Sequence, residues 1–229
     1  MKRLIPLLLI VLLCGLAFVS WKGTSAVRGK AVDGKGKPMA GISVVARQIS
    51  PAGRRMRTTT NDKGKFQFKR VTPATYEVVP VIDKSMTSAK VIVEAGPKPG
   101  RYRLPSPLVV RITKSPAGVI SDSHSGLQWF LASEATMTWT EAAGRAAALP
   151  GGGWRLPTRA ELGGIYDESY EGHADPLFLI DRNWVWTSEI AEDEQAWFFS
   201  FENEYEGTHP KEWLLTRGRV LAVRNRPDR

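Results

Sequence analysis

Apolar and polar residues alternate in short runs along residues 27 to about 113, and turn residues separate the runs. β-branched and aromatic residues dominate, and no stretch repeats with a helical period, so the pattern predicts strands. Clusters of Gly, Asn, Asp and Pro predict turns at 33–38, 50–53 and 61–64. The strands are expected at 27–32, 42–49, 56–60, 66–68, 76–82 and 91–94. Six or seven short strands at this spacing predict an all-β antiparallel sandwich.

The end of this region carries different signals. Four prolines in the eleven residues 97–107 predict an extended, stiff segment. Residues 108–112 are expected to form a last strand, and the linker is expected at 114–118. The first domain should therefore span 27–113 and the second 119–229.

The second half begins with two helix signals. Thr138 with Glu141, and Thr158 with Glu161, are capping boxes, in which the threonine hydroxyl accepts from the backbone while the glutamate reaches back to the cap. They predict helices over 142–148 and 162–166. Later alternation predicts strands at 184–188, 197–201 and 220–224. The fold class expected is α+β, with two short helices and a small antiparallel sheet.

The first 26 residues have the pattern of a secretory signal peptide. Lys2 and Arg3 precede an apolar run over residues 4–19. As a helix the run would rise about 24 Å, short of a ~30 Å hydrocarbon core, which favours cleavage over a permanent N-terminal anchor. Cys14 raises lipidation as a third alternative, although Leu13 is not the small residue that such a signal needs. The chain is expected in the periplasm, the outer envelope or outside the cell.

Charge and aromatic residues divide the chain in the same place. The 229 residues carry a formal net charge of +9, composed of +17 in residues 1–119 and −8 in residues 120–229. Seven of the eight tryptophans lie in the second half. Since Cys14 is the single cysteine, a disulfide within the chain and a multi-thiolate zinc site are excluded.

Several short motifs of the first domain resemble the carboxypeptidase regulatory-like domain, a transthyretin-like β-sandwich. They are Val27-Arg28-Gly29, Val32-Asp33, Gly36-Lys37-Pro38, Gly41 to Val44, Thr59 to Phe66 and Tyr76-Glu77-Val78. The segment has no histidine and no cysteine, so zinc peptidase chemistry is not expected and the module is interpreted as a scaffold. Seven cations of this domain allow two interpretations, a face that contacts an anionic surface or an ordinary solvated β surface. They are Arg54, Arg55, Arg57, Lys63, Lys65, Lys69 and Arg70. With four aromatic residues at 27–119, nucleic acid is not an expected partner.

The second half resembles the Lcl C-terminal-like domain, related to the C-type lectin and formylglycine-generating-enzyme folds. The resemblance rests on 122–129, 139–143, 154–162, 186–188, 196–199 and 222–224. Its motif residues are interpreted as core and cap positions: Trp129, Trp139, Trp154, Arg155, Pro157, Thr158, Glu161, Trp186 and Trp197. The resemblance implies a bacterial surface protein, because the fold includes glycan binders and the family is named for a collagen-like adhesin associated with sulfated polysaccharides.

No motif demands an enzyme, a cofactor or a metal. Without cysteines the second domain cannot perform the copper-dependent oxidation of its formylglycine-generating relatives. His124, His173 and His209 lie at no metal-ligand spacing. Two acidic segments could supply oxygen ligands to Ca²⁺ or simply form a solvated rim: Glu189, Glu192, Asp193 and Glu194, and Glu202, Asn203, Glu204 and Glu206.

A sugar site is expected where indole rings and hydrogen-bonding groups meet, because a sugar packs its C–H face on an indole while its hydroxyls bond to carboxylates or amides. The candidates are Trp184, Glu189, Asn203, Glu204 and Trp213. Alternation places Trp184 and Trp186 on one sheet face, whose burial would remove both from a surface site.

These observations predict an exported, non-enzymatic binding protein of the cell envelope or surface, which recognises a glycan or another surface component through its second domain. One alternative is a structural or assembly module in which the basic domain docks on the acidic one or on anionic lipid. Another is a hydrolase, which would need two opposed carboxylates or a strongly perturbed titratable group in a cleft.

Overall fold

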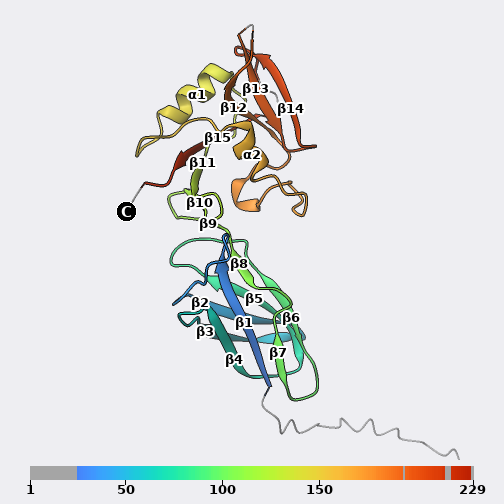
Figure 1. Ribbon diagram of the computed structural model, residues 1–229. Coiled ribbons are helices and arrows are strands. Elements are labelled where there is room, and N and C mark those ends of the chain that lie inside the picture. Colours follow the sequence, from blue (N-terminus) through green and yellow to red (C-terminus); the bar gives the residue numbers. More distant parts are fainter. Residues whose placement is uncertain (1–24, 193, 215–217, 228–229) are drawn as a thin grey trace, which may run out of the picture.

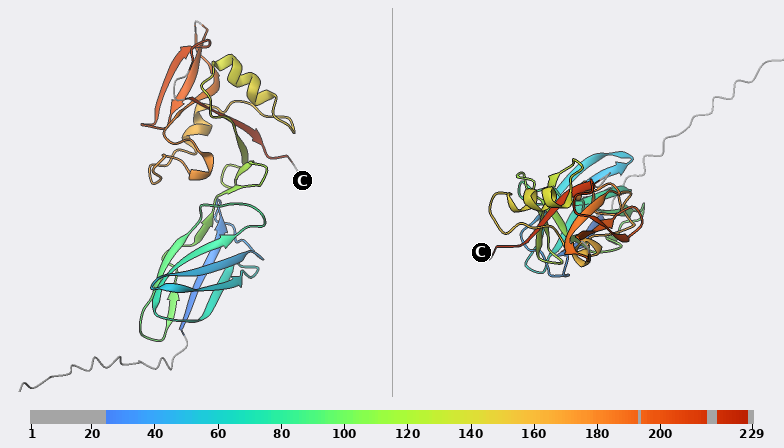
Figure 2. Two further views of the ribbon diagram at one scale, coloured as in Figure 1. Left: turned by 180° about the vertical axis from the view of Figure 1, so that it is seen from behind. Right: turned by 90° about the horizontal axis from the view of Figure 1, so that it is seen from above.

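The chain folds into two units joined end to end, as the computed structural model shows (Figure 1). The structure describes residues 25–192, 194–214 and 218–227. Seen from behind, the units follow one another along a single long axis, and seen from above along that axis they overlap (Figure 2). No helix in these described ranges is long and apolar enough to cross a membrane.

The first unit is a two-layered β-sandwich, which confirms the fold class expected from the sequence. Its strands are β1 (Ser25–Asp33), β2 (Ser43–Ser50), β3 (Ala52–Thr59), β4 (Lys65–Val71), β5 (Ala74–Val81), β6 (Val91–Ala95), β7 (Arg101–Arg103) and β8 (Leu108–Val110). One layer has the order β4-β1-β7, with β8 also paired to β1, and the other has the order β3-β2-β5-β6.

Two strands depart from the antiparallel pattern that we expected. β7 and β8 both pair with β1 in the parallel sense, Ala26 opposite Arg101 and Ala31 opposite Leu108. The reason is that residues after β6 carry the chain from one layer to the other, so that β7 enters beside β1 in the direction of β1 itself. β7 also lies inside the proline-rich segment 97–107, for which the sequence indicated only an extended conformation.

The sandwich begins before the expected boundary at residue 27. Ser25 is 1% exposed and its hydroxyl accepts from the amide of Gly100 at 3.0 Å. The amide of Ala26 donates to the carbonyl of the same Gly100. A signal segment ending at Ala26 would therefore remove two paired residues of β1, and the remainder of the predicted segment lies outside the described residues.

Aromatic packing fills the centre of the sandwich. Tyr76 is fully buried and its hydroxyl donates to the carbonyl of Thr72 at 3.0 Å. Phe66 and Phe68 pack edge to face at 5.8 Å. A Cβ atom at Gly29 would lie 2.4 Å from Cζ of Phe66, so the glycine makes room for the ring.

The second unit is a seven-stranded sheet with a helix on each face. Its elements are β9 (Ile112–Lys114), β10 (Ile120–Asp122), β11 (Leu127–Ser133), α1 (Trp139–Ala147), α2 (Arg159–Gly163), η1 (Pro176–Phe178), β12 (Trp184–Ile190), β13 (Gln195–Ser200), β14 (Tyr205–Pro210) and β15 (Gly218–Asn225). The strand order is β14-β13-β12-β15-β11-β10-β9, in which β12 and β15 run parallel. The expected α+β fold is confirmed, with a larger sheet than the sequence indicated.

Both predicted capping boxes form. Thr138 begins α1 and Thr158 begins α2, and each hydroxyl accepts from the amide of the glutamate three residues on. α1 buries Ala142 and Ala146 in one apolar cluster with Trp154 and Trp186. α2 contributes Leu162 to a second cluster on the opposite side of the sheet, which includes Trp129, Val185 and Phe199 of the strands and Phe178 of η1. Successive residues of a strand belong to opposite clusters, because successive side chains of a strand point to opposite faces of the sheet.

The segment 114–118, which we expected to be a linker, is part of a β-hairpin. Lys114 ends β9 and pairs opposite Ile120 of β10. The amide of Gly118 donates to the carbonyl of Ser115 at 2.9 Å, which closes the turn. Turn and linker residues are the same residue types, so only the pairing of the flanking strands distinguishes the two structures.

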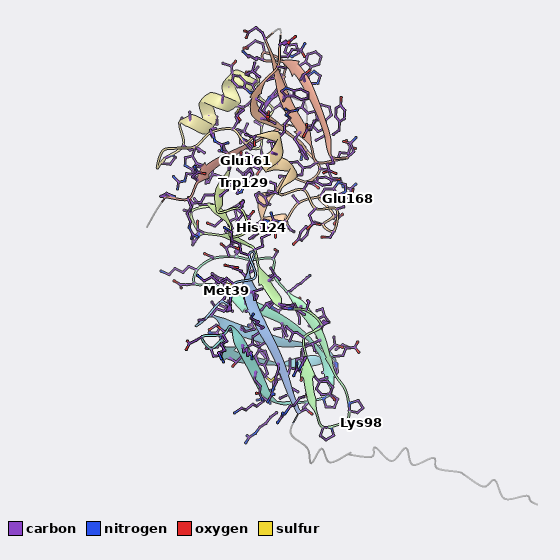
Figure 3. The ribbon with its side chains drawn as sticks, viewed as in Figure 1. Met39, Lys98, His124, Trp129, Glu161 and Glu168 are labelled. Carbon is purple, nitrogen blue, oxygen red and sulfur yellow. The ribbon has the colours of Figure 1, made fainter. Side chains whose placement is uncertain are left out.

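Hydrogen bonds connect the two units on both sides of this hairpin. Met86 and Lys114 exchange two backbone bonds of 2.8 and 2.9 Å. The amide of Gly34 donates to Oγ of Ser123 at 2.8 Å, and Nδ1 of His124 lies 3.0 Å from the carbonyl of Gly34. His124 stands at the junction of the units in Figure 3. A Cβ atom at Gly34 would lie 2.8 Å from the amide of His124, so this contact requires glycine.

An ion pair between a partly exposed arginine and a buried aspartate fixes the base of the hairpin. Asp122 accepts two hydrogen bonds from Arg111, at 3.2 and 3.0 Å, and others from the amide of His124 and the hydroxyl of Ser125. Burial of the carboxyl group acts to raise its pKa, but these bonds, led by that from Arg111, outweigh burial and the pKa of Asp122 is lowered. Folding therefore stabilises the ionised carboxylate.

Asp122→Asn is expected to lower the free energy of unfolding by about 2 kcal/mol at pH 7. The figure lies below that of a fully buried pair because Arg111 keeps about a third of its side chain exposed. Since the folded pKa is lowered, the stabilisation is complete above the unfolded pKa of about 3.9 and is lost as pH falls through the folded value. Urea unfolding of both proteins at pH 7, 5 and 3 measures the difference.

The exposed Asp62→Asn is the control, with an expected change below about 0.5 kcal/mol. Equal stability of Asp122→Asn and the unmodified chain at pH 7 would contradict the role of the pair.

Candidate functional site

One of the seven tryptophans of the second unit stands out by its exposure. Trp129, Trp154 and Trp186 are buried, and Trp139, Trp184 and Trp197 are partly buried. Trp213 is 52% exposed. The packing of the domain accounts for the other six indoles, whereas Trp213 presents a large apolar surface to solvent.

Trp213 is the outer member of a column of parallel rings. It stacks on His209 with ring centroids 4.9 Å apart and an interplanar angle of 11°. His209 stacks on Phe198 at 5.1 Å and 9°, and Phe198 stacks on Trp184 at 4.9 Å and 17°. Phe198 is 3% exposed, so the column leads from the domain core to the surface.

The register of three strands builds this column. Trp186 pairs opposite Phe198, and the neighbouring pairs on β13 and β14 are Phe198 with Gly207 and Ala196 with His209. The residues of these pairs therefore share one sheet face. After Pro210 the chain turns, with a 2.9 Å bond from the amide of Trp213 to the carbonyl of Pro210, and places the indole over His209.

Glycine is required in the middle of this face. A Cβ atom at Gly207 would lie 2.8 Å from Cζ of Phe198 and 2.9 Å from Cε1 of Tyr205. The absence of a side chain lets both rings lie across β14. Tyr205 is 56% exposed and its ring centroid is 6.1 Å from that of Phe198.

Polar contacts hold the turn that carries Trp213. Glu212 accepts from the hydroxyl of Thr140 at 2.9 Å, and Lys211 forms an ion pair with Glu194. The amide of Trp139, at the start of α1, donates to the carbonyl of Lys211 at 2.8 Å. The exposed indole therefore stands on a structured segment, beside a carboxylate that can accept further hydrogen bonds.

The structure brings two of the five predicted sugar-binding residues together. Trp184 and Trp213 belong to the same column, with Phe198 and His209 between them. The burial of Trp186 fits the interpretation of this sheet face as core, and Trp184 is only partly exposed. Trp213 is thus the member of the pair that presents its ring to solvent.

Glu189 lies in a different cluster. It accepts from the amide of Arg159 at 2.6 Å and forms an ion pair with its guanidinium at 3.2 Å. The same guanidinium pairs with Glu206 and covers the ring of Trp197 at 4.0 Å. These contacts fix the start of α2 on the sheet and occupy the carboxylate that we expected to hold a sugar.

Asn203 and Glu204 lie in the exposed turn between β13 and β14. His209, on whose ring Trp213 stacks, is five residues farther along the chain than Glu204. At the rise of a strand, five residues separate the two positions by about 16 Å. Glu204 has a positive φ of 54°, as a tight turn requires. These two residues border the end of the sheet near Tyr205 rather than the stack at Trp213.

The acidic segments do not assemble a cation site within the described ranges, where no group of three or more His, Cys, Asp and Glu side chains could hold a metal ion. Arg159 pairs with Glu189 and Glu206, and Lys211 pairs with Glu194. Asp193 lies outside the described residues. The three histidines have different surroundings. Nδ1 of His124 lies near the carbonyl of Gly34, Nδ1 of His173 lies 2.7 Å from the carbonyl of Phe201, and His209 stacks on Trp213.

A small cavity at the junction of the units bears on the hydrolase alternative, because two carboxylates line it. Asp167 and Asp175 line it together with Arg111 and Tyr170. Its volume is about 70 Å³, too small for a sugar ring or a peptide. Asp175 accepts from the amide of Leu177 and from the hydroxyl of Ser88, so it serves as a helix cap and a contact between units.

Sequence reasoning missed the residues that complete the column. Phe198 was expected in a strand, but β14, which carries His209 and Tyr205, was not predicted. Its sequence Tyr-Glu-Gly-Thr-His-Pro alternates in a way that places Tyr205, Gly207 and His209 on one face. That alternation was the available signal, although the strand is only six residues long and ends in proline.

Family comparisons assign both units. The model of the carboxypeptidase regulatory-like domain matches residues 26–99, and that of the Lcl C-terminal domain matches residues 118–224. The resemblances inferred from short motifs are thereby confirmed. A comparison with curated proteins finds no match.

Solved structures with similarity to the chain are distant. A 3-chlorocatechol 1,2-dioxygenase from Rhodococcus opacus is 14% identical with a TM-score of 0.24, over 36% of this chain and 59% of that one. The pilus adhesin RrgA from Streptococcus pneumoniae is 10% identical with a TM-score of 0.30, over 59% of this chain and 21% of that one. The chain thus spans about three fifths of the dioxygenase and a fifth of the adhesin, and neither likeness bears on function.

Trp213→Ala is expected to lower the free energy of unfolding by at most about 1 kcal/mol, because the indole is half exposed and loses mainly its stacking on His209. Trp129→Ala, at a fully buried indole, should cost about 3–5 kcal/mol. Urea unfolding of the two variants measures both values. A loss at Trp213 as large as that at Trp129 would show that the exposed ring is structural.

Proposed function

We propose that this chain, a carboxypeptidase regulatory-like domain followed by an Lcl C-terminal domain, is an exported, non-enzymatic protein of the cell envelope or surface that binds a glycan at Trp213. The two domain types are those of a surface or envelope protein, and both are non-catalytic types.

The single observation that carries the proposal is the ring column that ends in an exposed indole. Stacking on His209 restrains the ring of Trp213 before any ligand arrives, so little conformational entropy is lost on binding. A pyranose ring offers an apolar C–H face of similar size. The carboxylate of Glu212, the next residue along the chain, is available to accept hydrogen bonds from sugar hydroxyls.

The neighbouring surface supports an extended contact. Tyr205, Trp213 and Leu214 are each more than half exposed, at 56%, 52% and 55%. Tyr205 and Trp213 are the two ends of a row of rings. Phe198 contacts Tyr205, His209 contacts Trp213, and Phe198 and His209 stack on each other. Exposed apolar groups gathered in this way mark interaction surfaces, and a row suits a chain of sugars better than a single one.

The alternative of an assembly module held by charge receives less support. No ion pair among the described residues connects a cation of β1 to β8 with a carboxylate of the second unit. Backbone and hydroxyl hydrogen bonds make most of the junction. Among the described residues one ion pair adds to them, that of Arg111, directly after β8, with Asp122. A single charge pair, rather than the surplus of cations on β1 to β8, therefore contributes to the geometry of the junction.

Trp213→Ala is expected to weaken binding of the full chain to an immobilised neutral polysaccharide at least tenfold, because the stacking surface is lost. A panel of β-glucan, chitin and mannan is tested by surface plasmon resonance at 0.5 M NaCl, where contacts between exposed charges are screened. Tyr205→Ala should weaken binding less, about two- to fivefold, since its ring lies at the far end of the row.

Ile190→Ala, a 44% exposed apolar residue of β12 outside the column, is the matched control and should bind as the unmodified chain does. Absence of binding to every polysaccharide of the panel, or equal binding by Trp213→Ala, would overturn the proposal.

A further inference from the structure

The outer face of the layer β4-β1-β7 is occupied by cations. Val27, Phe66 and Tyr102 point into the sandwich core, so alternation turns their neighbours outward. The outward residues include six cations: Arg28, Lys30, Lys65, Lys69, Arg101 and Arg103. The described residues provide no ion-pair partner for any of the six.

Strand register sets like charges directly opposite one another. Lys30 pairs opposite Lys65, and Arg28 pairs opposite Arg103 on the other side of β1. Like charges in such cross-strand positions repel and destabilise a sheet. A scaffold alone would gain stability from a carboxylate at either position, so the arrangement indicates that an anion from outside the chain completes it.

These side chains line a groove. Its volume is about 720 Å³, within the range of ligand sites, and Arg28, Lys30, Lys65 and Arg103 contribute to its lining. The rest of its lining comes from Gly29, Thr58, Thr59, Asn61, Phe66, Gln67 and the segment 104–107, and no carboxylate lines it. Nε of Arg28 is buried and has no hydrogen-bond partner, which leaves a guanidinium donor unsatisfied.

We propose that this groove binds a linear polyanion through its phosphate or sulfate groups. The guanidinium groups of Arg28 and Arg103 suit bidentate contacts with such oxyanions, while Lys30 and Lys65 add point charges. The three strands span about 10 Å, and two residues along β1 span about 7 Å. Several anionic groups of one flexible chain can therefore be contacted together, whereas a single anion would leave most of the cations unpaired.

The shape of the site favours a chain over a flat membrane. Arg28 and Lys30 are only partly exposed, whereas residues 105–107 of the lining are exposed. A lipid surface would contact these exposed residues before it reached the two cations. A single aromatic residue, Phe66, lines the groove and is 5% exposed, so there is no platform on which nucleic-acid bases could stack.

The test uses the full chain, with inorganic polyphosphate and dextran sulfate as probes of the two kinds of oxyanion. Lys30→Gln combined with Lys65→Gln is expected to weaken binding to the preferred probe at least tenfold at 50 mM NaCl. The slope of log K against log salt should become shallower by about 1.5 to 2, in proportion to the two lost contacts. The probe bound more tightly identifies phosphate or sulfate as the natural group.

The matched control is Arg54→Gln combined with Arg55→Gln, which removes the same net charge from exposed positions on β3 outside the groove. It should change affinity less than threefold. Without ligand, the groove variant should unfold at an equal or higher temperature than the unmodified chain, since the opposition of Lys30 and Lys65 is relieved.

Equal losses in the two double variants would overturn the proposal in favour of general charge attraction. Failure to bind either probe, or tighter binding to vesicles containing 30% anionic lipid than to both probes, would overturn it as well. Trp213→Ala should leave polyphosphate and dextran sulfate binding unchanged, so this result and that of the neutral polysaccharides separate the two proposed sites.

Discussion

Aromatic rings buried on both faces of the seven-stranded sheet hold the second unit together. The unit has no cysteine and cannot use a disulfide, so apolar burial must replace that constraint. Trp129 packs edge to face on Phe178 in one layer, and Trp186 does the same on Phe198 in the other. The two layers pack on the two faces of the sheet. Phe198 stacks on His209 and His209 stacks on Trp213, so the buried ring sets the position of the exposed one.

The ring column shows how one buried side chain supports another at the surface. Phe198 is buried and contacts Trp184, His209 and Tyr205 on its several sides. Through these contacts the rigid interior restrains side chains that reach the solvent. A surface indole without such support would lose conformational freedom on binding a ligand, whereas Trp213 has already lost part of it in the folded state.

The two proposed sites rely on different forces, and they lie on different units. The surface at Trp213 offers apolar ring area and hydrogen bonds, which salt screens little. The groove beside Arg28 and Lys30 offers charge, which salt screens strongly. Because the junction is fixed by the bonds of Gly34, Met86 and Asp122, both surfaces are held in one frame.

The sequence by itself determined the two domains, most of their strands and both capping boxes. These features depend on residues close together in the chain: the alternation around Val44 and Val78, or a threonine three residues before a glutamate, as at Thr158 and Glu161. The motifs were sufficient to identify both families. The exposure of individual tryptophans was outside the reach of such local patterns, because the same indole serves a core and a surface equally well.

Tertiary structure decided what depends on pairing between distant segments. The turn at 114–118 became a hairpin through the pairing of β9 with β10, and Glu189 became a structural anion through Arg159, thirty residues earlier in the chain. The stack of Trp213 on His209 follows from the register of β14 on β13, and the cation groove follows from that of β1 with β4 and β7. Register is set by the packing of whole layers, so no short stretch of sequence contains it.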